Sequence, residues 1–196
     1  MVNVNNEQAN FVNSNIIIKT DGTAPSMTIT SPIPTGWTNK DVMISFTSSD
    51  NRSGVKTNQI KYTGKNTAPN EVTLDNRNRI TFTNTDKYSV TLLSIDKVGN
   101  ISKTSGSFGI DKINPVIGTT PSNGTKYLDM TTLNITSTDA GGSLMKSLTL
   151  YRNNIKVKEG VDSVSYFENI NGTHTFKVVA KDNAGNVSER EFTITI

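Results

Sequence analysis

Five aspartates recur at matching places in two similar halves of this chain, and their carboxylates are the groups best suited to chemistry. They are Asp50, Asp96 and Asp111, followed by Asp139 and Asp182. Carboxylate oxygens are hard ligands that suit Ca2+, so loops gathered at one end of a fold could bind this cation near the junction of the halves. Each loop brings only one carboxylate, however, and Asp is also a common turn former. We therefore expect turn formers and no bound metal, with Ca2+ at these positions as the alternative.

Two of these aspartates open a motif that occurs twice, Asp96-Lys-Val-Gly-Asn100 and Asp182-Asn-Ala-Gly-Asn186. An alternating apolar run precedes each copy, which is the period of a half-buried strand. The Asp can accept N–H groups of the turn, and the Gly supplies a positive φ. The motif predicts a strand, a tight turn and a return strand. The residues expected to build the two turns are Asp96, Gly99, Asn100, Asp182, Gly185 and Asn186.

Catalytic chemistry finds little support in the rest of the sequence. His174 is the only histidine and the chain has no cysteine, which excludes disulfides, thiolate metal sites and a cysteine nucleophile. A histidine base or ligand would need partners that the chain does not supply. No nucleophile elbow, phosphate loop or dinucleotide fingerprint is present. We expect no enzymatic activity and no cofactor, and a partly buried, structural His174.

The composition favours two small β domains over one large core. The 196 residues are 33% hydrophobic with a mean hydropathy of −0.40, and Asn, Thr, Ser and Gly are abundant. Two domains of roughly 90 residues suit such a lean chain. The net charge of +3 is spread without a Lys/Arg-rich run, which argues against nucleic acid as a partner. No apolar run approaches the roughly 20 residues that a membrane-spanning helix needs.

Short apolar runs between turn residues divide the chain into two units of one plan, residues 21–111 and 112–196. Seven short runs in the first unit are the spacing of a β-sandwich. They are Met27–Thr30, Val42–Phe46, Ile60–Tyr62, Val72–Leu74, Ile80–Phe82, Tyr88–Ile95 and Ile101–Ile110.

The second unit can be matched to the first residue by residue. Leu133 and Ile135 correspond to Ile44 and Phe46. The remaining matches set Leu148, Leu150 and Tyr151 against Ile60 and Tyr62, and Phe167 against Phe82. Asn153-Asn154 is expected to be a hairpin turn, because Asn tolerates positive φ.

The segments outside the two units are short. Residues 1–20 are polar until Ile16–Ile18, and this segment is either the last strand of a preceding repeat or disordered. The stretch Asp111-Lys-Ile-Asn-Pro115 joins the units. Its proline fixes one φ and pushes the preceding residue to an extended geometry, so we expect a stiff linker.

These features together resemble the bacterial immunoglobulin-like repeats of Gram-positive surface proteins. The residues that carry the likeness are Gly36-Trp-Thr-Asn-Lys-Asp-Val42, Ser49-Asp-Asn-Arg-Ser-Gly-Val55, both Asp-x-x-Gly-Asn turns and Ile110-Asp-Lys-Ile-Asn-Pro115. The likeness covers residues 21–196. The second unit departs from it, with Leu128-Asp-Met130 in place of the Trp-Thr-Asn stretch and Leu144 after the loop serine. It implies two tandem immunoglobulin-like or fibronectin-like sandwiches without enzymatic activity.

The resulting expectation is a stalk or spacer of an extracellular or cell-surface bacterial protein, of which the chain is a piece. Its expected partners are neighbouring repeats of the same polypeptide and a host or cell-wall glycan or protein, with no membrane insertion. One alternative is an adhesive or carbohydrate-binding module, such as an adhesin tip or an accessory domain of a secreted glycan-active enzyme. In that case Trp37 is the candidate ligand aromatic, although packing in the core or at its rim is the better explanation for this residue. A phage tail or baseplate decoration is the other alternative.

Overall fold

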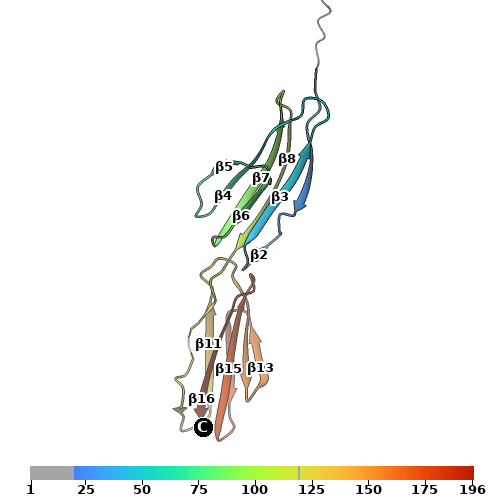
Figure 1. Ribbon diagram of the computed structural model, residues 1–196. Helices are drawn as coiled ribbons and strands as arrows, with labels where there is room; N and C mark the ends of the chain where they lie inside the picture. The colour runs from blue at the N-terminus through green and yellow to red at the C-terminus, as the bar shows by residue number, and fades with distance from the viewer. Residues whose placement is uncertain (1–19, 119) are drawn as a thin grey trace, which may run out of the picture.

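The chain is all-β in the computed structural model, which describes residues 20–118 and 120–196. Sixteen strands and no helix lie in this part of the chain, so it holds no helical segment that could cross a membrane. Figure 1 shows two β-sandwiches placed end to end. The segment between Ile110 and Val116 joins them. The expected strand at Ile16–Ile18 falls outside the described residues.

Domain 1 is a sandwich of a three-stranded and a five-stranded sheet. The small sheet has the order β1-β3-β6, and the large sheet has the order β2-β8-β7-β4-β5. The strands are β1 (Ser26–Ser31), β2 (Trp37–Thr38), β3 (Val42–Ser49), β4 (Val55–Gly64), β5 (Asn70–Thr73), β6 (Arg79–Phe82), β7 (Asp86–Asp96) and β8 (Ile101–Ile110). All neighbours are antiparallel except β2, which runs parallel to β8.

Domain 2 repeats this plan strand for strand. Its sheets have the orders β14-β11-β9 and β10-β16-β15-β12-β13. The strands are β9 (Val116–Ile117), β10 (Thr125–Lys126), β11 (Thr131–Thr138), β12 (Met145–Arg152), β13 (Ile155–Gly160), β14 (Ser163–Glu168), β15 (Thr173–Asp182) and β16 (Val187–Thr195). β10 again pairs parallel to the last strand. The repeat inferred from the doubled Asp-x-x-Gly-Asn motif is therefore a repeat of whole sandwiches.

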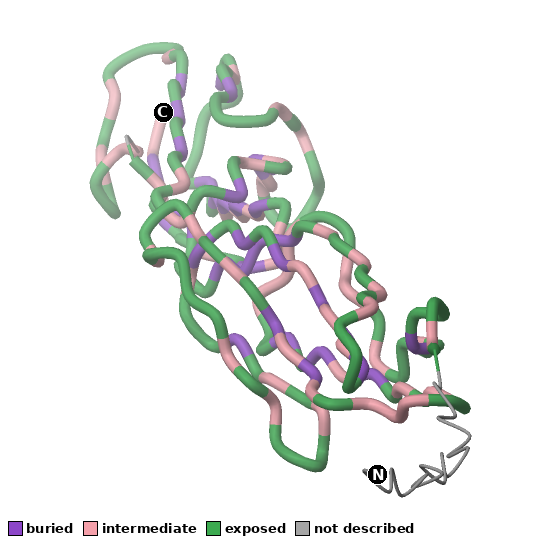
Figure 2. Tube along the Cα trace, turned by 90° about the horizontal axis from the view of Figure 1, so that it is seen from above, coloured by how far each residue is buried: buried purple, intermediate pink, exposed green. Residues whose placement is uncertain are grey.

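The alternation in the sequence becomes alternation in burial, because successive side chains on a strand point to opposite sheet faces. Along β7, every second residue from Asp86 to Asp96 is buried. Figure 2 shows the same alternation of buried and less buried positions along the strands. Each domain encloses its own apolar core. That of domain 1 is centred on Ile44, Phe46, Ile60, Leu92 and Phe108, and that of domain 2 on Leu133, Ile135, Leu150, Phe176 and Val178.

Several short edge strands were not expected from the sequence. β2 and β10 have two residues each, too few for a visible alternation, and they exist because the last strand of each domain offers a free edge. The predicted hairpin turn is confirmed: Asn153 and Asn154 have φ of 47° and 66° and connect β12 to β13. The predicted run Val72–Leu74 falls at the end of β5, which stops at Thr73.

Matching Phe167 to Phe82 is wrong. Phe82 faces Val42 across the small sheet and is 5% exposed, whereas Phe167 faces Thr132 and is 55% exposed. The residue in the place of Phe82 is the buried Glu168, which faces Thr131. The error is one residue, and one residue moves a side chain to the opposite face of a sheet.

The match of Tyr151 to Tyr62 fails for the same reason. Tyr62 lies opposite Val90, six residues before Asp96, and Arg152 lies opposite Phe176, six residues before Asp182. The true counterpart of Tyr62 is therefore Arg152.

The two corrections concern one place, the end of each core that lies away from the Asp-x-x-Gly-Asn turn. In domain 1, Phe82 packs edge-on against Tyr62 and Phe108, with ring centroids 5.1 Å and 5.3 Å apart. In domain 2, the Arg152 Nε donates to Glu168 Oε2 at 2.5 Å in the same position. Aromatic packing closes one core and a buried ion pair closes the other.

Candidate functional site

The Asp96 turn is held by the side chain that opens it. One carboxylate oxygen, Oδ1, accepts the backbone N–H groups of Val98 at 3.0 Å, Gly99 at 2.6 Å and Asn100 at 2.8 Å. The other, Oδ2, accepts the Asn100 side-chain amide at 2.7 Å. Gly99 has a φ of 101°, a backbone conformation that is unfavourable for any residue with a Cβ. The turn is thus built around a fully buried carboxylate.

The Asp182 turn has the same construction. Its Oδ1 accepts Gly185 N at 2.7 Å and Asn186 N at 2.8 Å, and its Oδ2 accepts the Asn186 amide at 2.7 Å. Gly185 has a φ of 98°. All six residues expected to build the two turns therefore lie in them.

A third position, at the entry to each domain, completes the arrangement. The Asn186 amide also donates to the carbonyl of Asp111 at 2.8 Å, and the Asn100 amide donates to the carbonyl of Asp21 at 3.1 Å. Sequence reasoning missed Asp21. The signal was present, since Asp21 stands four residues before Pro25 as Asp111 stands four residues before Pro115.

The loops at Asp50 and Asp139 reach the same place. Asp50 Oδ1 accepts Gly54 N at 2.7 Å, and Asp139 Oδ2 accepts Leu144 N at 2.7 Å. These loops also donate to the entry aspartates, because Ser53 N bonds to Asp21 Oδ2 at 3.0 Å and Ser143 N bonds to Asp111 Oδ2 at 3.1 Å.

Three carboxylates converge in each domain as a result. We call Asp21, Asp50 and Asp96 the upper acidic cluster and Asp111, Asp139 and Asp182 the junction acidic cluster; within each, one oxygen per residue lies within 4.8 Å of the others. Such oxygens are able to ligate a divalent cation such as Ca2+. The sequence analysis counted one carboxylate per loop against such a site, and in the structure three segments each bring one carboxylate to the same place. The expectation of turn formers without a metal stays a prediction.

Hydrogen bonding offsets the repulsion within the upper acidic cluster. Burial alone would raise the pKa of Asp96, but bonds from the Asn100 side chain and from turn N–H groups outweigh it and hold that pKa below its usual value. The backbone N–H of Thr23 and bonds from Ser53 likewise lower the pKa of Asp21. Both carboxylates are therefore held in their ionised form.

The linker between the domains is hydrogen-bonded to both of them. Asp111 N donates to the carbonyl of Thr38 in domain 1 at 2.9 Å, while its Oδ2 accepts Ser143 N of domain 2. Lys112 N donates to Thr85 Oγ1 at 3.0 Å, and Ser188 Oγ donates to the carbonyl of Pro115 at 2.6 Å. Lys112 and Asp41 add an exposed ion pair.

Trp37 lies at this junction. A Cβ built on Gly109 would fall 2.2–2.6 Å from three atoms of the indole ring, so the ring rests directly on this glycine. A Cβ on Gly142 of domain 2 would lie 3.3 Å from the ring's Cη2. A Cβ built on Gly185 of domain 2 would likewise lie 3.8 Å from Asn39 Nδ2. Residues 36–39, which we call the foot of domain 1, therefore stand on the Gly142 loop and the Asp182 turn.

A cleft of about 380 Å³ beside Trp37 is lined from both domains. Lys65, Lys87 and Asp86 line it from domain 1, and residues 140–144 line it from domain 2. Burial alone would raise the pKa of Asp86, but bonds from the Thr67 hydroxyl and from backbone N–H groups hold it below its usual value. The Asp86 carboxylate therefore bonds within domain 1, to Asn66 N, Thr67 Oγ1 and Lys87 N.

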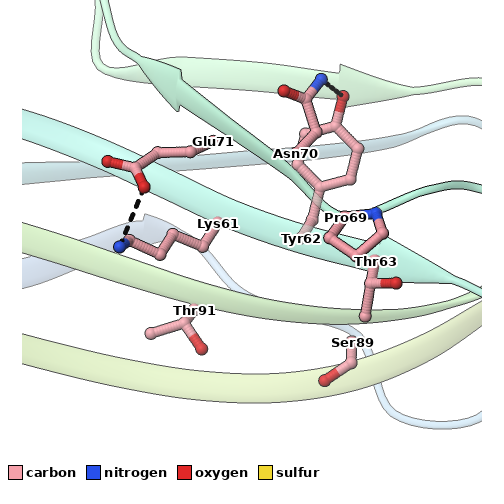
Figure 3. Close-up of a pocket in the computed structure, with 8 residues that line it drawn as sticks. All are labelled: Lys61, Tyr62, Thr63, Pro69, Asn70, Glu71, Ser89 and Thr91. Carbon is pink, nitrogen blue, oxygen red and sulfur yellow. Dashed lines mark hydrogen bonds and ion pairs between the residues drawn. The ribbon is translucent and has the colours of Figure 1, made fainter.

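A separate shallow groove of about 360 Å³ lies in domain 1 over β4, β5 and β7 (Figure 3). Polar side chains stand in its lining: Lys61 forms a 2.9 Å ion pair with Glu71, and the Asn70 amide donates to the Tyr62 hydroxyl at 2.9 Å. Thr91 and Ser89 face it from β7. The groove offers hydroxyl, amide and charged groups.

His174 is 7% exposed and lies in the polar end of the domain 2 core. Its Nε2 is 2.8 Å from the carbonyl of Ile170, and the Arg152 Nη2 is 3.2 Å from the ring nitrogens. Arg152 in turn pairs with Glu168, which also accepts Ile170 N at 3.0 Å. These partners place the histidine in a buried structural network.

No protein-family model and no curated protein sequence matches the chain. Solved structures do resemble it. A three-domain structure of titin, I67–I69, in an E-to-A variant, gives a TM-score of 0.50 at 14% identity, covering 88% of this chain and 66% of that one. Three N-terminal domains of the outer capsid protein Hoc of bacteriophage RB49 give 0.51 at 11% identity, with coverages of 88% and 70%.

Bacterial fibronectin(III)-like modules of Clostridium thermocellum CbhA align over 87% of this chain and 94% of theirs, at 15% identity and a TM-score of 0.39. At such identities the likeness concerns the fold alone. Together with the two pairs of sheets, the likeness to the titin and Hoc structures shows that the chain consists of two tandem immunoglobulin-like β-sandwich domains.

Proposed function

We propose that the chain is a non-enzymatic spacer, a stiff segment of a bacterial surface or secreted protein that holds other parts of that protein apart. The observation that carries this proposal is the bonding of Asp111. One residue of the linker donates through its backbone N–H to domain 1 and accepts through its carboxylate and carbonyl from domain 2.

Every contact of such a linker restrains the angle between the domains. Asp111 is fully buried, so its bonds are shielded from competing water. The Trp37 ring fills the space between Gly109 and Gly142, which leaves little room for bending toward that side. Pro115 has a fixed φ and a carbonyl bonded by Ser188. The end-to-end placement in Figure 1 is what a spacer requires.

Small-angle X-ray scattering of the full chain tests this function. We expect a rod whose maximum dimension matches two sandwiches end to end, with the same profile from low to high protein concentration. A variant with about ten Gly and Ser residues inserted after Ile113 is the matched control and should give a broader distribution of shapes. A native profile as broad as that of the insertion variant would refute the spacer function.

The scattering is recorded in Ca2+ and in a chelator, since the junction acidic cluster offers oxygen ligands. A rod in both conditions assigns the stiffness to the protein's own hydrogen bonds. A rod that bends only in the chelator assigns it to a cation at the junction acidic cluster.

An adhesive or carbohydrate-binding role is the second candidate, and the groove of Figure 3 is the feature that favours it. Its Lys61, Asn70 and Glu71 side chains offer donors and acceptors of the kind that sugar hydroxyls need. A glycan array probed with the native chain tests this role. A signal lost in a Lys61→Ala variant would support it, and silence across the array would count against it.

A further inference from the structure

The end of domain 1 that lies away from domain 2 has a hollow of about 530 Å³. We call this end the upper face of domain 1. Its lining residues are Thr20, Asp21, Arg52, Ser53, Lys97 and Val98. They belong to the domain's entry segment, its Asp50 loop and its Asp96 turn.

This upper face is built like the face of domain 2 that receives domain 1. Ser53 N bonds to Asp21 as Ser143 N bonds to Asp111. The other shared bonds join the turn to the loop, the turn Asn to the entry carbonyl, and the strand Ser to the entry proline. They are Lys97 N to Gly54 O and Asn183 N to Leu144 O, Asn100 to Asp21 O and Asn186 to Asp111 O, and Ser102 to Pro25 O and Ser188 to Pro115 O.

In domain 2 this face is covered. The foot of domain 1 lies on it, with Trp37 against Gly142 and Asn39 near Gly185. The last strand of domain 1, β8, ends at Ile110 and runs straight into Asp111. Asp21 is bonded in domain 1 as Asp111 is in domain 2, so a chain that enters at Asp21 arrives in the same way.

We propose that the upper face of domain 1 is the docking surface for a further immunoglobulin-like unit, one whose last strand runs into Asp21 and whose foot carries an aromatic residue at the place of Trp37. The proposal rests on the spacer function and extends it, since it assigns the surface on which a longer rod would be built. The internal junction supplies the geometry of the contact.

The charges of the upper face select the occupant. Arg52 precedes Ser53 as Gly142 precedes Ser143, and Lys97 follows Asp96 as Asn183 follows Asp182. Two cations thus line the upper face where domain 2 has uncharged residues. A guanidinium favours the face of an aromatic ring, so an aromatic foot suits this surface.

A second copy of this chain is a poor occupant for the same reason. Lys126 pairs with Thr195 in domain 2 as Trp37 pairs with Gly109 in domain 1. The foot of domain 2 would therefore set Lys126 against Arg52 and Lys97, and like charges repel. The occupant that fits is a unit with the foot of domain 1 and not that of domain 2.

The absence of cysteine gives a direct test, because any introduced thiol is the only one. Val98 is 59% exposed on the upper face, so the thiol of Val98→Cys should react fast with a disulfide reagent in the native chain. A copy of residues 21–110 is then fused ahead of Asp21, so that the added foot meets this face. We expect the labelling rate at position 98 to fall at least tenfold in the fusion.

Three controls define the result. Leu128→Cys, on a fully exposed side chain far from the upper face, should label equally fast with and without the added unit. Ala184→Cys stands at the place of Val98 in domain 2 and gives the rate for a docked turn in the native chain. The fusion whose added unit carries Trp37→Ala should regain fast labelling at position 98.

Undiminished labelling at position 98 in the fusion would overturn the proposal, provided that amide hydrogen exchange shows the added unit to be folded. Should the added unit not fold, two full chains are joined from Ile196 to Asp21. The joined chain with Lys126→Trp should then protect position 98 of the second copy, while the joined native chain should not, and equal rates in both would overturn it.

These outcomes are separable from failure of the spacer function. Fast labelling at Ala184→Cys and a bent native chain in scattering would mean that the internal junction itself is loose, which refutes the spacer. Slow labelling at Ala184→Cys with fast labelling at Val98→Cys in the fusion refutes only the docking surface.

Discussion

The side-chain amide of Asn186 donates a hydrogen bond of 2.8 Å to the backbone carbonyl of Asp111, which lies 75 residues earlier in the chain. The same amide donates to Asp182 at 2.7 Å. One buried side chain therefore ties the last turn of domain 2 to the linker through which domain 1 enters. The bond makes the closing turn of a sandwich part of the joint between two sandwiches.

Asn186→Ala is expected to weaken both the turn and the joint. It leaves two buried acceptors, the Asp111 carbonyl and Asp182 Oδ2, without this donor. The loss of a donor typically costs about 1–3 kcal/mol for each buried acceptor. Asn100→Ala is the matched control, because it makes the same loss in domain 1 away from the junction. We expect both variants to lower the urea midpoint of their own domain, and only Asn186→Ala to broaden the scattering distribution. Equal broadening in both would contradict the assigned role.

The ion pair of Arg152 and Glu168 can be tested against its aromatic equivalent. Glu168→Ala leaves a largely buried guanidinium unpaired, and such a loss costs about 3–5 kcal/mol. The double variant Arg152→Tyr, Glu168→Phe copies the Tyr62 and Phe82 pair of domain 1. We expect it to recover most of the free energy of unfolding of domain 2, measured by urea titration. A double variant less stable than Glu168→Ala would show that the core of domain 2 cannot take the aromatic solution.

Ser94→Ala is expected to stabilise domain 1. The Ser94 hydroxyl is fully buried and has no hydrogen-bond partner among the described residues. Burying such a group costs about 1–3 kcal/mol, so its removal should raise the free energy of unfolding by about 1 kcal/mol. Domain 2 has the buried Ala180 at this place, two residues before its own turn Asp. The reverse change, Ala180→Ser, should lower the stability of domain 2 in calorimetry, and a stabilising Ala180→Ser would contradict the argument.

Leu144→Gly tests backbone strain. Leu144 has a φ of 68° at the position where domain 1 has Gly54 with a φ of 78°. The left-handed conformation costs a non-glycine residue about 1–2 kcal/mol, and glycine gives back about 0.5–1 kcal/mol through its freer unfolded chain. We expect a net gain of up to about 1 kcal/mol in thermal unfolding of domain 2. Leu128→Gly, at an exposed residue without positive φ, should instead destabilise. The same sign for both changes would be evidence against strain.

Stability should fall in acid because the ionised carboxylates are the bonded forms. The pKa of Asp96 and that of Asp86 are lowered by hydrogen bonds that outweigh burial. A group with a folded pKa below its unfolded value of about 3.9 contributes stability above that pH and loses it as the pH falls toward the folded pKa. Urea midpoints measured from pH 7 to pH 3 should therefore decline below about pH 4. The decline should be shallower in Asp86→Asn, and a flat profile in the native chain would refute the argument.

Much of the fold was predictable from local sequence because alternation and turn chemistry act over a few residues. The strand β7 was visible in every second residue from Tyr88 onward, and Gly99 marked the turn that ends it. The doubled motif fixed the tandem plan, since a repeated turn implies a repeated sandwich. These properties depend on side-chain direction and backbone φ, which neighbours along the chain decide.

The pairing register between strands could not be predicted from the sequence. Phe167 and Glu168 are adjacent, and only their pairing with Thr132 and Thr131 decides that the carboxylate is buried and the ring is exposed. Glutamate is rarely buried unless its charge is paired. Glu168 is tolerated in the core because Arg152 forms an ion pair with it from another strand. The partner is 16 residues away, and no local pattern announces it.

The sequence by itself determined that this chain is two β-sandwiches in series, because strand period and turn residues are local properties. The tertiary structure alone decided what those turns are used for. It brought Asp111, Asp139 and Asp182 together from three separate loops and set Trp37 between Gly109 and Gly142. Convergence of distant loops depends on how sheets pack and where one domain ends on the next, and that is settled by long-range contacts.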